Sequence, residues 1–357
     1  MAVNIYRLMK KTPFIIVALA VFGFFTPGCS PKPYDCSQVD VICVGMVTNV
    51  GRRDDRAYNQ AVWEGLQLAK ASGAADWVAV IETAAARDYE ENIRVFAEAD
   101  YDVIVTVGSA MGEATQAMAR TYPTPYFIGL DQEQLPDQDL SPNLVGLVFA
   151  EDQIGYLAGA LAAMLTKTGQ IGAVFASDEL PFIKRYGDGY RAGAAATNPD
   201  VIVTVVYHND VDLQQSFSDP QWGAATANSL IDAQVDIVFG VGGTTGSEAL
   251  AASAMRSVYV IGADIDQYFA LPGSAPFLYT SFVKMIAPGI ADLISAAKEA
   301  QIDIAPFPND NYLGQVGLAP YHESGATIPE EVKSRIDTLY QALLSGEIQT
   351  GVSTIRP

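Results

Sequence analysis

The chain has 357 residues, of which 50% are hydrophobic and 17% are charged, and its formal net charge is −20. A chain this apolar is not intrinsically disordered, and one this acidic has no general phosphate-contacting face for nucleic acid. Three cysteines and two histidines exclude a disulfide framework and a histidine-rich metal site. At roughly 150 residues per domain, the length allows two domains.

The N-terminus has the pattern of a signal peptide. Three basic residues precede an apolar run from Phe14 to Phe25, and no acidic residue occurs among the first 28. The run is shorter than the ~20 residues that cross a bilayer, and its basic flank is typical of a secretory signal. A short membrane anchor is the alternative. No later segment is apolar enough for a second span.

Residues 27–29 indicate how that signal ends. A small residue, Gly28, directly precedes Cys29 at the end of the apolar run, which resembles a bacterial lipobox. In such signals the cysteine becomes the lipidated first residue, although Pro27 departs from the usual small residue. We therefore predict a lipoprotein signal peptide over 1–28, lipidation of Cys29, a tether over 29–40, and lipid anchoring at the extracytoplasmic face of the cell membrane.

The other two cysteines, Cys36 and Cys43, then lie outside the cytoplasm, where a disulfide is permitted. Cys43 falls within an apolar strand pattern, so a small buried thiol is the alternative. The sequence leaves both possibilities open.

From Val41 onward, short Val- and Ile-rich runs alternate with helical patterns in two consecutive series. Continuous apolar runs indicate parallel strands buried on both faces, and the alternation indicates an α/β fold with right-handed crossovers. The predicted strands are Val41–Thr48, Trp77–Ile81, Asp102–Val107, Pro125–Leu130, Leu144–Phe149, Gln170–Phe175, Val201–Val206, Val235–Phe239 and Val258–Gly262. The predicted helices are Tyr58–Ser72, Asp88–Ala99, Met111–Arg120, Gln153–Lys167, Pro181–Thr197, Pro220–Ala233 and Thr245–Ala254.

The last eighty residues contain too few elements for a third domain. We predict a strand over Phe277–Ser281, helices over Met285–Ala300 and Glu330–Ser345, and a surface loop over Pro306–Asn311. These elements complete the two α/β halves by crossing back between them.

Motifs of several enzyme classes are missing. The chain has no phosphate-binding Walker loop, no zincin motif and no nucleophile elbow. His208 and His322 are far apart in sequence, so each is predicted at a surface or in a loop rather than in a catalytic dyad. The 41 acidic residues leave carboxylate catalysis open, but no pattern singles out a pair.

Polar residues follow the predicted strands, at the sheet edge where open α/β sheets bind ligands. An acid in such a position is a helix cap or a ligand contact, and a glycine-rich stretch is a tight turn or a ligand cradle. Asn59 is likewise a helix cap or a contact, and Tyr58 is a core aromatic or a stacking platform. The strand-end residues are Thr48, Asn49, Ser109, Asp131, Ser177, Asp178, Gly242, Gly243 and Asp264.

Several motifs together resemble the basic membrane protein family, the substrate-binding lipoproteins of ABC importers typified by the purine nucleoside receptor. The resemblance covers about residues 41–350, and each motif alone is weak. The matching segments are 47–65, 149–159, 183–193, 216–220, 262–267 and 280–284.

The resemblance implies a fold. It is the type I periplasmic-binding-protein fold, with two doubly wound parallel-sheet lobes that close on a ligand and three crossing segments as a hinge. In this chain the lobes would be 41–149 with about 282–312, and 150–281 with about 313–357. The crossings would lie near Phe149–Asp152, Thr280–Lys284 and Leu313–Leu318.

The resemblance also implies a ligand and its contacts. Tyr58 and Phe217 would sandwich a purine, while Asp264 and Lys284 would hold the ribose hydroxyls with help from backbone at Gly242 or Gly243. Asp131 matches a further acid of the cleft. The candidate ligand-binding residues are Asn49, Tyr58, Asn59, Ser109, Asp131, Phe217, Gly242, Gly243, Asp264 and Lys284.

One position departs from the family. Asn49 stands where the family has an Asp that reads an N–H of the base, and an amide both donates and accepts. Base preference is therefore expected to differ. Arg52 and Arg53 lie beside it, either as solvated surface charges or as groups that favour a more acidic base.

The sequence thus predicts a binding protein that makes and breaks no bond and needs no cofactor or metal. It would capture a purine nucleoside or nucleobase and deliver it to an ABC permease. The alternatives are another heterocycle or a sugar, such as a flavin, on the same fold, or a nucleoside-acting enzyme.

Overall fold

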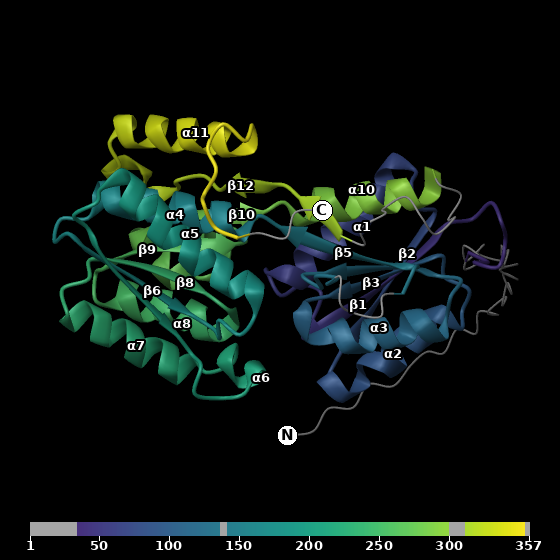
Figure 1. Ribbon diagram of the computed structural model, residues 1–357. Helices are drawn as coiled ribbons and strands as arrows, with labels where there is room; N and C mark the ends of the chain where they lie inside the picture. Colours follow the sequence, from purple (N-terminus) through teal and green to yellow (C-terminus); the bar gives the residue numbers. More distant parts are fainter. Residues whose placement is uncertain (1–33, 136–140, 300–310, 354–357) are drawn as a thin grey trace, which may run out of the picture. The chain divides into compact units, whose positions relative to one another are not determined.

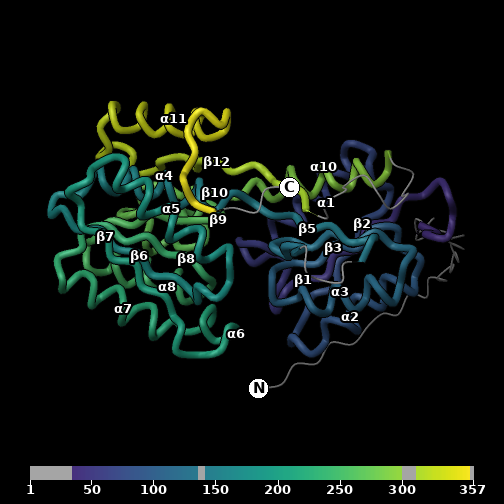
Figure 2. The backbone as a smooth tube through the Cα atoms, viewed as in Figure 1, coloured from purple at the N-terminus to yellow at the C-terminus, as the bar shows by residue number. Residues whose placement is uncertain are grey.

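The computed structural model describes residues 34–135, 141–299 and 311–353. The predicted signal peptide and Cys29 lie outside them, as does most of the predicted loop over Pro306–Asn311. Within the described ranges the chain forms two six-stranded sheets, drawn as arrows in Figure 1 and as a tube in Figure 2. Among those described residues, no helix is both long and apolar enough to cross a bilayer.

The first half of the molecule is built on the sheet with strand order β11-β5-β4-β3-β1-β2, in which neighbouring strands are parallel. Helices α1 and α10 pack together on one face, and α2 and α3 on the other (Figure 1). Its elements are β1 Cys43–Val50, α1 Tyr58–Ser72, β2 Trp77–Thr83, α2 Tyr89–Ala97, β3 Val103–Val107, α3 Gly112–Thr121, β4 Tyr126–Leu130, β5 Leu144–Phe149, α10 Ile286–Glu299 and β11 Asn311–Gly314.

The second half is built on the sheet β12-β10-β9-β8-β6-β7, which is parallel except where β12 pairs antiparallel with β10. Helices α4 and α5 pack against each other, as do α7 and α8 (Figure 1). Its elements are α4 Glu151–Leu165, β6 Gln170–Phe175, α5 Pro181–Thr197, β7 Ile202–Tyr207, α6 Leu213–Ser216, α7 Pro220–Asp232, β8 Ile237–Val241, α8 Gly243–Met255, β9 Tyr259–Asp264, α9 Gln267–Ala270, β10 Leu278–Lys284, β12 Val316–Leu318 and α11 Glu330–Leu344. Short 3₁₀ turns lie at Ala86–Asp88, Ser109–Met111, Pro272–Phe277 and Glu323–Thr327.

Local chemistry explains where several elements begin and end. The central strands are buried on both faces because helices cover both sides of each sheet, as their continuous Val and Ile runs predict. Helix α5 begins at Pro181, whose fixed φ suits the first helical turn. Helix α1 ends at Gly73, which takes the left-handed conformation (φ 81°) and donates its N–H to the last carbonyls.

The chain passes three times between the two halves. It crosses at Ala150 after β5, at Met285 after β10, and at Gln315 between β11 and β12. The last two crossings touch, because the Met285 N–H donates to the Gln315 carbonyl at 2.9 Å. These residues lie in or beside the three predicted crossing segments. Two sheets with three crossings define the predicted type I periplasmic-binding-protein fold.

Two expectations are corrected or settled by the structure. Asn311, the last residue of the predicted surface loop, is buried and opens β11, and neither β11 nor β12 was predicted. These strands are only four and three residues long, too short for a recognisable apolar pattern. The two possibilities left open for Cys36 and Cys43 resolve to a disulfide, which ties residue 36 to the first residue of β1.

Helices α4 and α5 approach each other backbone to backbone. A Cβ on Gly193 would lie 1.9 Å from the Tyr156 carbonyl oxygen, and one on Gly155 would lie 2.1 Å from the Tyr186 carbonyl oxygen. No side chain can turn away to relieve such a contact, so the helices would have to separate.

We expect Gly193→Ala to lower the free energy of unfolding by about 1–3 kcal/mol or more, the usual cost of overpacking a core. Gly273→Ala is the matched control, because no atom lies within 4 Å of a Cβ built there. Urea titration of the three proteins measures the difference. Equal midpoints for both variants would contradict the close contact.

Candidate ligand-binding site

A cavity of about 460 Å³ lies where the strand ends of the two halves meet. This volume is within the range of small-molecule sites, which are concave and mostly apolar with a few polar groups. Both halves contribute. The lining residues are Asn49, Tyr58, Ala86, Tyr89, Gly108, Ser109, Ala110, Asp131, Leu180, Phe182, Ile183, Leu213, Gln214, Phe217, Val241, Gly242, Gly243 and Asp264.

Aromatic rings supply much of the apolar lining. Tyr58 comes from the start of α1 and Tyr89 from the start of α2, both in the first half. Phe182 is the second residue of α5 and Phe217 follows α6, both in the second half, and their ring centroids lie 6.4 Å apart. The cavity therefore offers ring faces from both halves to a flat ligand.

Two acidic residues follow equivalent strands of the two sheets. Asp131 comes directly after β4 and Asp264 is the last residue of β9, and both have positive φ, 54° and 70°. This conformation is uncommon for a residue other than glycine and clusters at functional sites. It turns the chain sharply at the sheet edge, where both carboxylates line the cavity.

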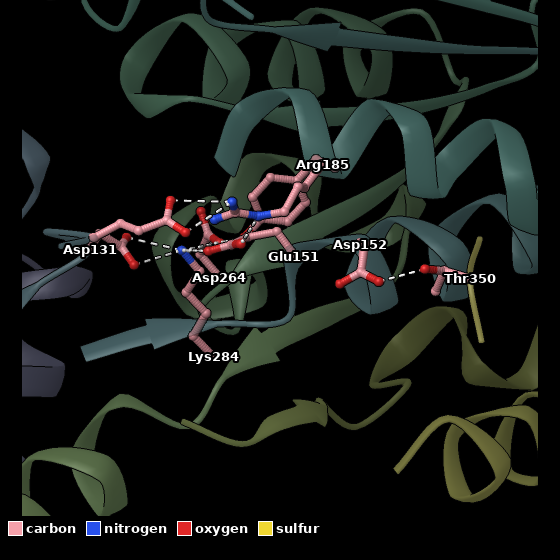
Figure 3. A network of polar contacts seen from close by, with 9 residues as sticks. Asp131, Glu151, Asp152, Arg185, Asp264, Lys284 and Thr350 are labelled. Atoms are coloured by element: carbon pink, nitrogen blue, oxygen red, sulfur yellow. Dashed lines mark hydrogen bonds and ion pairs between the residues drawn. The ribbon is translucent and has the colours of Figure 1, made fainter. Parts of the chain in front are cut away.

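A buried lysine joins these carboxylates (Figure 3). The Lys284 ammonium lies 2.9 Å from both carboxylate oxygens of Asp131 and 3.8 Å from Oδ1 of Asp264. It also lies 3.3 Å from Oε1 of Glu151. Because Asp131 belongs to the first half and Asp264 to the second, Lys284 bridges the halves beneath the cavity.

Aromatic rings surround the same ammonium. Its nitrogen lies between 5.4 and 5.8 Å from the ring centroids of Tyr58, Phe149, Phe182 and Tyr186. These cation–π contacts and the carboxylates compensate for the loss of water around a buried charge. Lys284 is fixed from all sides, so the cavity residues that it contacts are fixed as well.

The network continues through Arg185 of α5 (Figure 3). Its Nε donates to Oε2 of Glu151 at 2.9 Å, and its Nη1 donates to Oε2 of Glu133 at 3.2 Å. Next to Glu151, the Thr350 hydroxyl donates to Asp152 at 2.5 Å and holds the C-terminal segment on the start of α4. The helix α4 start, the α5 start and the segment after β4 are thereby joined.

Burial and charge shift the pKa values of this network. Burial raises the pKa of Glu151 to about 7, although Lys284 and Arg185 oppose the shift. Burial also raises the pKa of Asp264 against the pull of Lys284. For Lys284 itself, burial would lower the pKa, but the carboxylates of Asp131, Asp264 and Glu151 outweigh it and raise the pKa. The lysine is therefore charged and Glu151 titrates near neutral pH.

The tyrosine hydroxyls remain protonated donors. Burial, followed by the nearby carboxylates of Asp131 and Asp264, raises the pKa of Tyr58 well above its ordinary value. Burial, followed by the carboxylate of Asp264, also raises the pKa of Tyr186, whose hydroxyl donates to Asp264. The carboxylates and hydroxyls give this end of the cavity the polar character that suits hydroxyl or N–H groups of a ligand.

An amide and two glycines also line the cavity. Asn49 lines the cavity and accepts a hydrogen bond from buried Asn59, which does not itself line it. Gly242, with φ 104°, precedes α8, and Gly243 is the first residue of that helix; both line the cavity. The predicted glycine-rich turn is thus both a structural turn and part of the cavity wall.

Eight of the ten candidate residues line the cavity, and two lie behind it. Asn59 holds Asn49, and Lys284 holds Asp131. Sequence reasoning missed Phe182, Tyr89 and Gln214 in the wall. It also missed Glu151 and Arg185, although both occur in the segments 149–159 and 183–193 that carry the family resemblance.

Arg52 and Arg53 are both exposed and lie outside the cavity lining. Arg52 pairs with Asp54 at 2.8 Å, and Arg53 lies over the ring of Trp63. Of the two readings left open, solvated surface charge is the one that these contacts support.

The histidines belong to separate local clusters. His208 lies in a loop but is buried, not at the surface, stacked on Trp222 at 4.0 Å and 2.7 Å from Asp210. His322 stacks on Tyr268 and contacts Asp266 at 2.7 Å. Within the described ranges, no group of three or more His, Cys, Asp or Glu side chains is arranged to hold a metal ion.

The fold and the cavity between strand ends define a solute-binding protein of the periplasmic-binding type. The chain belongs to the Bmp family, PnrA-like substrate-binding proteins of ABC transporters, whose model matches residues 42–300. Proteins of this family are extracytoplasmic.

Individual relatives agree with that assignment. The chain is 30% identical to a Lactococcus lactis protein named ABC transporter nucleoside-binding protein BmpA, over 82% of this chain and 86% of that one. It is 29% identical to a CD4+ T-cell-stimulating antigen of Listeria monocytogenes, over 86% and 87%. A solved ABC transporter solute-binding protein from Conexibacter woesei shares the fold, with a TM-score of 0.66 and 24% identity, over 87% of this chain and 98% of that one.

The raised pKa of Glu151 predicts a pH-dependent stability. A carboxyl with pKa 4.5 when unfolded and about 7 when folded binds more protons in the native state between these values. Its contribution to the free energy of unfolding therefore falls as the pH rises from about 4.5 to 7. We expect Glu151→Gln to remove this fall, so that the variant gains stability relative to the wild type across this range.

Chemical denaturation at several pH values between 4.5 and 7.5 measures the difference. Glu347→Gln, at an exposed position, is the control and should follow the wild-type profile. Parallel profiles for the wild type and Glu151→Gln would show that folding does not raise the pKa of Glu151.

Proposed function

We propose that the protein is the lipid-anchored receptor of an ABC importer and that it binds a purine nucleoside or nucleobase. The observation that carries the proposal is one cavity with Tyr58 and Phe217 from opposite halves and the carboxylates of Asp131 and Asp264 at one end. Rings from both halves favour a flat heterocycle, and acceptors beside it favour sugar hydroxyls. The printed name of the Lactococcus lactis relative supports a nucleoside.

Binding in this proposal needs no chemistry on the ligand. The purine stacks between Tyr58 and Phe217, and the ribose hydroxyls donate to Asp264 and Asp131, whose positions Lys284 fixes. Ser109 and the backbone at Gly242 and Gly243 complete the contacts. The lobes, predicted at 41–149 with about 282–312 and 150–281 with about 313–357, are each built on one sheet, and they close on the ligand by bending at the crossings Ala150, Met285 and Gln315. The closed form then docks on the permease.

Thermal unfolding of the chain from residue 30 against nucleosides, nucleobases, riboflavin and simple sugars tests the ligand. A ligand at about 100 times its dissociation constant adds roughly 2.7 kcal/mol of stability, a shift of several degrees. A shift with purine compounds alone supports the proposal. A shift only with riboflavin or a sugar would overturn the purine assignment.

Removing either ring should weaken binding. Base–aromatic stacking is worth about 1–3 kcal/mol, so we expect Tyr58→Ala and Phe217→Ala each to reduce affinity for the purine by about 5- to 150-fold. Phe269→Ala is the control, because that ring is exposed and lies outside the cavity lining. Isothermal calorimetry with the wild type and all three variants measures the affinity for the purine. Wild-type affinity in both cavity variants would show that neither ring stacks on the ligand.

The anchor is tested separately. If Cys29 carries lipid, Cys29→Ser should move the protein from the membrane fraction to the soluble fraction of the producing bacterium, whereas Ser30→Ala should leave it on the membrane. Membrane retention of Cys29→Ser would contradict lipidation at this residue.

A further inference from the structure

Two asparagines form a reciprocal pair at the edge of the cavity. The Asn49 backbone N–H donates to Oδ1 of Asn59 at 3.2 Å, and Nδ2 of Asn59 donates to Oδ1 of Asn49 at 2.7 Å. Asn59 is 1% exposed, whereas Asn49 lines the cavity. The inner amide therefore holds the outer one by two hydrogen bonds.

These contacts determine which way each amide faces. A backbone N–H only donates, so the Asn59 atom that meets it is the oxygen. The other end of the Asn59 amide is then its NH₂ group, and the Asn49 atom that meets it must be an oxygen. The orientation thus follows from a backbone group, not from the choice between two similar side-chain atoms.

Asn59 is itself held in place. Its backbone N–H donates to Asp55 at 3.2 Å, and Asp55 also accepts from the N–H groups of Ala57 and Gln60 at 2.7 and 3.1 Å. This carboxylate closes the start of α1 and fixes its first turn. These hydrogen bonds fix the position of Asn59 and therefore of the asparagine pair.

The remaining end of Asn49 points to the cavity side. A Cβ on Gly108, a cavity-lining residue, would lie 3.8 Å from Asn49 Nδ2, whereas one on Gly51, outside the lining, would lie 4.0 Å from Asn49 Oδ1. Among the described residues, none accepts a hydrogen bond from Asn49 Nδ2. The cavity wall thus holds an oriented donor that has no acceptor within the described part of the chain.

We propose that Asn49 determines specificity as a fixed hydrogen-bond donor and that the ligand presents an acceptor to it, either a ring-nitrogen lone pair or an exocyclic carbonyl oxygen. The proposal rests on the proposed function and narrows its ligand class. A ligand with only an N–H at this edge would place two donors face to face, leaving both unpaired.

A substitution at Asn59 can turn the group that Asn49 presents to the cavity from a donor into an acceptor, while Asn49 itself stays unchanged. In Asn59→Asp, one carboxylate oxygen still accepts from the Asn49 N–H, but the other can no longer donate. The Asn49 amide must then turn, so that Nδ2 donates to residue 59 and Oδ1 faces the cavity. Asn49→Asp places an acceptor there directly. Asn92→Asp adds the same charge to the first half outside the cavity lining and is the matched control.

Calorimetry with a purine nucleoside and analogues that each lack one acceptor tests the proposal. The analogues are the 1-deaza, 3-deaza and 7-deaza nucleosides, together with the 6-unsubstituted purine riboside when the parent carries a 6-oxo group. We expect one deletion to reduce wild-type and Asn92→Asp affinity by about 5- to 150-fold, the effect of one unpaired buried group. The same deletion should have no effect in Asn49→Asp and Asn59→Asp.

Equal wild-type affinity for the parent and all analogues would overturn the proposal, as would an Asn59→Asp variant with the wild-type order of affinities. Failure of every nucleoside to bind the wild type would instead overturn the proposed function. Amide NMR of the ligand-free protein with labelled asparagine then tests the pair by itself. Slow exchange of the Asn59 side-chain NH₂ and fast exchange of the Asn49 NH₂ support it, and the reverse contradicts it.

Discussion

The ammonium of Lys284 holds the two halves of the protein in register at the binding cavity. It lies against Asp131 of the first half and against Asp264 and Glu151 of the second, at a depth where water does not screen it. Removing one partner of such a buried pair typically costs 3–5 kcal/mol, because the other charge is left uncompensated. The rings of Tyr58 and Phe182 that line the cavity pack around the same charge. Cavity shape and charge pairing are therefore set by one residue.

The carboxylates of Asp131 and Asp264 follow the same local sequence and backbone pattern in the two halves. Residues 126–131 and 259–264 share the pattern Tyr-x-Ile-Gly-x-Asp, and each aspartate adopts positive φ after its strand. The glycine of each pattern, Gly129 or Gly262, faces a glutamine side chain that folds back on it, Gln132 or Gln267. The similarity between the two halves ends at Lys284. Strand β5 lies beside the strand before Asp131 and ends at Phe149, whereas β10 lies beside the strand that ends at Asp264 and itself ends at Lys284.

Much of this was predictable from sequence because the signals are local. The bounds of α1 and α5 follow from Gly73 and Pro181, and the strand-end aspartates follow from buried strands that stop at a charge. The fold of two parallel sheets followed from the alternation of such elements and from the family resemblance.

Other features depend on contacts between distant parts of the chain. Strand β11 forms by pairing along its whole length with β5, from Asn311 opposite Gly146, and its four residues carry too little pattern to reveal a partner so far away. Glu151 appears in the sequence as an ordinary acid at a helix start, and only the fold brings Arg185 and Lys284 to it. The orientation of the Asn49 amide could not be predicted from sequence, because it depends on the contact of a backbone N–H with Asn59.

The glycine contacts between α4 and α5 constrain how this molecule can move. Shear motions slide packed helices over one another by small rotamer changes of the side chains between them. Where Gly193 lies on the Tyr156 carbonyl and Gly155 on the Tyr186 carbonyl, no side chains stand between the helices to make such changes. Glu151 and Arg185 belong to these two helices, so they keep their separation as long as α4 and α5 move together. Helices α4 and α5 must then move as one body in any rearrangement of the second half, and the crossings at Ala150, Met285 and Gln315 are where that half joins the other.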